Sequence, residues 1–144
     1  MKPYFIAILF IFLVLVLLLN SDFAYSEVPG WHTTILPPWT IAAFIAIILL
    51  ALSAIGYFIL GKKNKITNKK ITVFHIVSTF PAVILLKTGP LSYYFMDPKT
   101  TPSDLTSIMN ITTIFQIFII AMFLVGHIIF FVSLTKSLLT NSNT

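Results

Sequence analysis

The sequence predicts an all-α integral membrane protein, built as a bundle of four transmembrane helices. Of the 144 residues, 58% are hydrophobic and only 9% are charged, whereas a soluble domain carries about 25% charged residues. A membrane helix needs roughly 20 apolar residues, so the chain is long enough for four crossings. Long apolar runs without alternation indicate helices, because lipid leaves backbone groups no other partners. We therefore expect one domain over residues 1–144.

Four apolar segments account for the predicted spans. The first covers residues 3–19 and has no polar side-chain group except the Tyr4 hydroxyl. The second covers residues 39–60 and is rich in Ile, Ala and Leu, and the third covers 71–86. The fourth, residues 105–135, is long enough to tilt or to extend beyond the lipid. Because the first segment has no polar or small-residue stripe, we expect it to lie against lipid or a partner.

The first segment also resembles a secretory signal peptide. Met1-Lys2 precede its apolar core, and Ala24-Tyr25-Ser26 provides a small-x-small cleavage site. The core is longer than the usual length of roughly 7–15 residues, so we expect the segment to remain as a span. Cleavage would leave the arrangement of the other three spans unchanged.

The distribution of charge predicts the orientation. Residues 61–70, GKKNKITNKK, hold five lysines and no acid, and Lys2 and Lys136 fall on the same side if the spans alternate. All four acids fall on the other side, together with two lysines: Asp22, Glu27, Asp97, Asp104, Lys87 and Lys99. The positive-inside rule then places both termini in the cytoplasm. Lysines gathered between spans indicate topology, so we expect no nucleic acid partner.

Polar residues inside the spans predict which faces meet. Such residues are costly in lipid and usually face the bundle interior. Helical spacing places one set on a face of the third span: His75, Ser78, Thr79 and Ala82. It places another on the fourth: Thr112, Thr113, Gln116, Ile120, Phe123 and His127. We expect these faces to pack together, beside a stripe of small residues on the second span: Ala42, Ala46, Ser53 and Gly56.

His75 and His127 have three possible uses. They can hydrogen-bond to Ser, Thr or Gln across helices as structural groups. Because they lie at similar depths, they can also be the axial ligands of a bis-histidine haem b, or His127 can pass protons along Gln116 and Thr113. The chain has no cysteine, which excludes thiolate metal sites and iron–sulfur ligation. We expect no metal and no cofactor bound by this chain, with haem as an alternative.

The stretch between the first two spans combines acids, a histidine and aromatic residues. Trp31 and Trp39 are expected to settle at headgroup depth. A carboxylate from Asp22 or Glu27 and the His32 imidazole suit a quinol, whose hydroxyls lose protons as it is oxidised. The alternative is an interfacial loop that only anchors the two helices.

The same stretch resembles a known family. Residues 21–38, SDFAYSEVPGWHTTILPP, resemble a segment of the NrfD-like, polysulfide-reductase-type membrane subunits, particularly the quinol-interacting subunit of alternative complex III. The resemblance implies a periplasmic loop that closes one span and opens the next, in a subunit without its own redox cofactor. It highlights six residues: Asp22, Ser26, Trp31, His32, Thr33 and Thr34. Family members have more spans, so this chain would be a small separate subunit or a reduced relative.

Together these observations predict an accessory or quinol-proximal subunit of a bacterial respiratory electron-transfer complex, of the alternative complex III or terminal oxidase type. Its expected partners are the lipid bilayer of the inner membrane and other membrane subunits. We expect no catalytic activity from the chain alone. The alternatives are a structural assembly subunit and a small bis-histidine haem membrane protein.

Overall fold

The protein is all-helical. The computed structural model describes residues 2–19, 38–65, 68–89, 91, 95 and 101–140. Four helices cover most of these residues: α1 (Pro3–Leu18), α2 (Pro38–Lys62), α3 (Lys69–Thr88) and α5 (Pro102–Leu139). Each predicted span falls on one of them, and no end differs by more than four residues. The all-helical class is therefore confirmed.

Local sequence explains where the helices begin and end. Proline occupies the first turn of α1 and α5, where its missing N–H costs nothing. Asn68 caps α3, its side chain accepting the Lys70 N–H at 3.0 Å, and Gly89 ends the helix at φ 79°. Thr101 caps α5 by accepting the Asp104 N–H at 3.3 Å. These caps satisfy orphan backbone groups at the helix ends.

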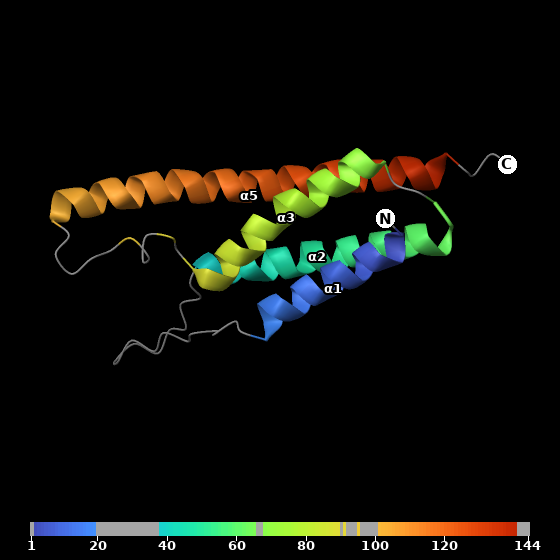
Figure 1. Ribbon diagram of the computed structural model, residues 1–144, viewed down its shortest axis with the longest axis horizontal. Helices are drawn as coiled ribbons and strands as arrows, with labels where there is room; N and C mark the ends of the chain where they lie inside the picture. Colours follow the sequence, from blue (N-terminus) through green and yellow to red (C-terminus); the bar gives the residue numbers. More distant parts are fainter. Residues whose placement is uncertain are drawn as a thin grey trace.

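The helices associate as two pairs that pack on each other. α1 lies along α2, and α3 lies along α5 (Figure 1). Glycines permit close approach between the helices. A β-carbon at Gly61 would lie 2.9 Å from the Tyr4 ring of α1, and one at Gly56 would lie 2.8 Å from Leu134 of α5. Gly56, Ala46 and Ser53 are buried, as expected for a small-residue stripe along which backbones approach.

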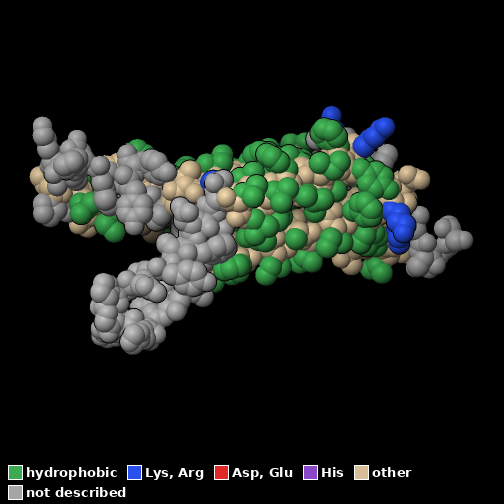
Figure 2. All heavy atoms as spheres, turned by 90° about the horizontal axis from the view of Figure 1, so that it is seen from below, with side chains coloured by type: hydrophobic (Ala, Val, Ile, Leu, Met, Phe, Trp, Pro, Cys, Tyr) green, Lys and Arg blue, Asp and Glu red, His purple; other side chains and the backbone are tan. Residues whose placement is uncertain are grey.

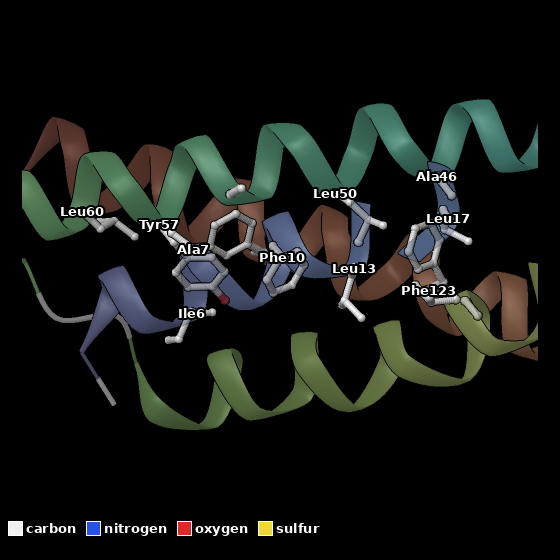
Figure 3. Packing of buried hydrophobic residues seen from close by; sticks show 14 residues of the cluster. Ile6, Ala7, Phe10, Leu13, Leu17, Ala46, Leu50, Tyr57, Leu60 and Phe123 are labelled. Carbon is white, nitrogen blue, oxygen red and sulfur yellow. The ribbon is translucent and has the colours of Figure 1, made fainter. Parts of the chain in front are cut away.

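α1 contributes more to the core than its sequence predicts. One of its faces is buried: Ile6, Ala7, Phe10, Leu13 and Leu17. These side chains pack against Ala46, Leu50, Tyr57 and Leu60 of α2 and against Phe123 of α5 (Figure 3). The expectation that this span lies only against lipid or a partner is wrong. An evenly apolar helix gives no pattern to reveal its buried face, because shape complementarity alone selects it.

Seven of the eight lysines in the described ranges gather at one end of the bundle, while the eighth, Lys87, lies in the last turn of α3 at the other end. The N-terminus, the end of α2, the start of α3 and the end of α5 lie together there (Figure 1), and Figure 2 shows blue side chains at this end. Lys65 donates a hydrogen bond to the Ser137 carbonyl near the end of α5. Leu19 and Pro38, which bound the segment 20–37, lie at the ends of α1 and α2 that point the other way.

Three of the helices are long and apolar enough to cross a membrane: α2, α3 and α5. α1 is a shorter apolar helix of 16 residues. At ~1.5 Å per residue, α1 is about 24 Å long and α5, with 38 residues, about 57 Å. These lengths and compositions indicate a membrane protein.

Candidate functional site

A cluster of polar and aromatic side chains fills the bundle near its lysine end. Its members come from all four helices: Phe10, Tyr57, His75, His127 and Phe130, called the histidine cluster below. His75 lies six residues after Lys69 and His127 nine residues before Lys136, so the cluster is roughly 9–14 Å from the lysines along the helix axes. All five side chains are at most 1% exposed.

The structure brings the two predicted histidines into direct contact. The His75 and His127 ring centroids lie 4.5 Å apart with an interplanar angle of 89°. Phe130 stacks on His75 at 4.5 Å and Phe10 covers it at 4.8 Å. Ser78, Thr79 and Ala82 are buried on the same face of α3, so the predicted polar face of this helix is confirmed.

One nitrogen of each imidazole is fixed by a hydrogen bond. His127 Nδ1 lies 2.9 Å from the Phe123 carbonyl; because a carbonyl only accepts, Nδ1 carries the proton and the neutral ring keeps a lone pair on Nε2. His75 Nδ1 lies 3.1 Å from the Tyr57 hydroxyl. The Tyr57–His75 hydrogen bond therefore joins α2 to α3.

The other two nitrogens are buried without a partner. His75 Nε2 and His127 Nε2 have no hydrogen bond within the described part of the chain, and neither does the buried Ser53 Oγ. Buried polar groups usually have a hydrogen-bond partner, so these three atoms are exceptions within the described interior. Across the ranges that the structure covers, no group of three or more metal-ligating side chains occurs.

The packing does not fit a haem between the histidines. Axial imidazoles stand on opposite faces of one macrocycle. Here the rings meet edge to face at 4.5 Å, and Phe10 and Phe130 cover His75. These contacts leave no plane between His75 and His127 for a macrocycle. The arrangement is instead that of side chains hydrogen-bonded and stacked across helices.

The predicted polar face of the fourth span is only partly buried. Thr112, Phe123 and His127 are buried, but Gln116 is half-buried and Thr113 is exposed, contrary to expectation. The reason is that α5 runs past its neighbours at this end (Figure 1). His127 and Gln116 are eleven residues apart, roughly 16 Å along the helix, so a proton path between them would need further polar groups or water molecules.

The quinol candidates lie outside the described residues: Asp22, Glu27 and His32. Of the two predicted interfacial aromatic residues, Trp31 also lies outside them, while Trp39 lies in the first turn of α2. Conversely, the sequence pattern did not identify Phe10, Phe130 or Gly126. Gly126 lies where α5 meets Ser78 of α3. A glycine within an apolar span was the available signal, because small residues mark helix contacts. Nothing in the pattern distinguished Phe10 from the other phenylalanines.

Comparison of the chain with protein-family models, with curated proteins and with solved structures found no match.

Proposed function

We propose that this chain is an accessory, quinol-proximal subunit of a bacterial respiratory electron-transfer complex of the alternative complex III or terminal oxidase type. Four spans would hold it in the inner membrane with both termini in the cytoplasm. The segment 20–37, with Asp22, Glu27 and His32, would help to shape a quinol pocket or a contact with a periplasmic cytochrome. The histidine cluster would hold the helices together.

The placement of most lysines opposite the helix ends that bound the segment 20–37 supports this proposal. Seven of the eight described lysines lie at one end of the bundle, while the two bounding helix ends, Leu19 and Pro38, point the other way (Figure 1). Positive residues favour the cytoplasmic side, so the acids and the imidazole would emerge on the opposite surface. There they could accept the protons that a quinol releases when it is oxidised.

α1 is compatible with a fourth span although it is short. Its 16 residues extend about 24 Å, against a hydrocarbon thickness of about 30 Å. A bilayer accommodates a short helix by local thinning, at a cost of fractions of a kcal/mol per Å. The buried face of α1 fixes it beside α2, so it would share the tilt of the bundle.

Replacement of the two central polar residues tests the proposal. In membranes where the complex assembles normally, Asp22→Asn and His32→Ala should lower quinol oxidation and change its inhibitor sensitivity. Asp104→Asn is the matched control, because this acid also lies at the end away from the lysines but begins α5. Unchanged quinol oxidation in both variants would contradict the proposal.

A structural assembly subunit is the second candidate, and α5 favours it. Of the described side chains between Ser103 and Met122, Thr112 alone is buried. Ile111 and Ile114 are each 69% exposed. An apolar helix of about 57 Å exceeds the hydrocarbon layer, so its free surface suits another subunit. Copurification distinguishes the candidates. An assembly subunit stays with its complex when Asp22 and His32 are replaced but is lost when Ile114→Ser disrupts this surface.

A further inference from the structure

A groove runs between α1 and α2 on the outer surface of the bundle. It has a volume of about 340 Å³. Three alanines make room for it, and five larger apolar side chains line the rest: Ala7, Ala51, Ala54, Ile11, Val14, Leu15, Ile55 and Phe58. No charged side chain takes part in this lining. The groove is therefore shaped for an apolar chain.

One end of the groove points toward the lysines. Phe58 is the lining residue of α2 nearest to this end, and Lys62 follows four residues later on the same helix face, roughly 6 Å further along. The Tyr4 ring packs edge to face against Phe58 at 5.5 Å. Tyr4 also lines a second hollow of about 430 Å³, together with Lys2, Phe5 and Ile8.

The charge at this end is strongly positive. Seven lysines belong to it: Lys2, Lys62, Lys63, Lys65, Lys69, Lys70 and Lys136. Asp104, the one acid within the described ranges, lies at the start of α5, at the opposite end. Juxtamembrane lysines attract anionic lipid headgroups. Lys2 and Lys62 are the members of this group closest along the chain to the two hollows.

We propose that the α1–α2 groove and the adjoining lysines form a binding site for one anionic phospholipid. Its phosphate would lie among Lys2, Lys62 and the Tyr4 hydroxyl, and one acyl chain would follow the groove past Phe58 toward Leu15. An acyl chain gains little by leaving other lipid tails for an apolar groove, so selectivity comes from the headgroup. This inference depends on the helix arrangement and is independent of the proposed respiratory role.

Native mass spectrometry of the full chain in mild detergent tests the site. Delipidated protein is titrated with phosphatidylglycerol or with phosphatidylcholine of the same acyl chains. We expect a one-to-one adduct with phosphatidylglycerol and much weaker binding of phosphatidylcholine. Lys2→Gln and Lys62→Gln should each weaken the adduct about fivefold. Lys136→Gln, at the same end but on α5, should leave its affinity nearly unchanged.

A second pair of variants tests the path of the acyl chain. Ala51→Phe fills the groove and should weaken the adduct, whereas Ala121→Phe, on the exposed surface of α5, should not. Helix content measured by circular dichroism identifies any variant that misfolds, and the lysine variants remain informative in that case. Equal binding of the two lipids would overturn the proposal. Equal weakening by Lys136→Gln would also overturn it, because it would indicate diffuse attraction to the whole end.

Discussion

Gly126→Ala should loosen the contact between α3 and α5. A β-carbon at position 126 would overlap Ser78 Oγ and lie 3.2 Å from Ser78 Cβ and 3.8 Å from the His75 backbone. Rotating the hydroxyl away does not relieve the contact with Ser78 Cβ, so the helices must separate slightly. Overpacking costs about 1–3 kcal/mol, and replacing a helical glycine by alanine returns up to ~1 kcal/mol. We expect a net loss of roughly 1–2 kcal/mol.

Steric trapping in bicelles measures reversible unfolding and therefore this loss of stability. A double-mutant cycle with Ser78→Ala isolates its cause. The Ser78 hydroxyl donates to the His75 carbonyl of its own helix at 3.1 Å. The same carbonyl also accepts from the Thr79 hydroxyl. Ser78→Ala alone should therefore cost less than about 1 kcal/mol. It removes the overlapping oxygen, so the two substitutions should couple by about 1 kcal/mol. Wild-type stability of Gly126→Ala, or strict additivity in the cycle, would refute the reasoning.

The remaining predictions concern the core, the polar contacts, the topology and haem. Phe10→Ala should lower the free energy of unfolding by about 3 kcal/mol, because Phe10 is fully buried against three rings of the cluster. Phe12→Ala is the control and should lower it little, because the Phe12 side chain is 58% exposed; unfolding measurements compare the two variants. Tyr57→Phe removes the 3.1 Å hydrogen bond to a histidine nitrogen and should cost about 1 kcal/mol by the same assay. The chain has no cysteine, so single substitutions report topology cleanly: Lys63→Cys should be labelled by a membrane-impermeant reagent only after cells are opened, and Ser103→Cys in intact cells. The purified chain should show no Soret band, because its histidine rings are in direct contact; such a band would contradict the fit of these side chains.

The helices were predictable from sequence because the membrane restricts the choices so strongly. Apolar runs must be helical in lipid, and the bounds follow from charged loops and from caps such as Asn68 and Thr101. His75, Ser78 and Thr79 share a buried face as their spacing predicted. Thr113 did not follow its spacing, because helical periodicity gives a direction and cannot tell whether a neighbouring helix reaches that depth.

Residues close together in the chain were enough to predict the helical class, the approximate helix ends and the concentration of lysines between two apolar segments. Three features instead depend on how the helices pack: the burial of Phe10 against both histidines, the hydrogen bond between Tyr57 and His75, and the groove between α1 and α2. The apolar pattern could not predict them because lipid and neighbouring helices are about equally apolar. Hydrophobicity therefore places a helix in the membrane, but the shapes of the meeting side chains decide which face is buried.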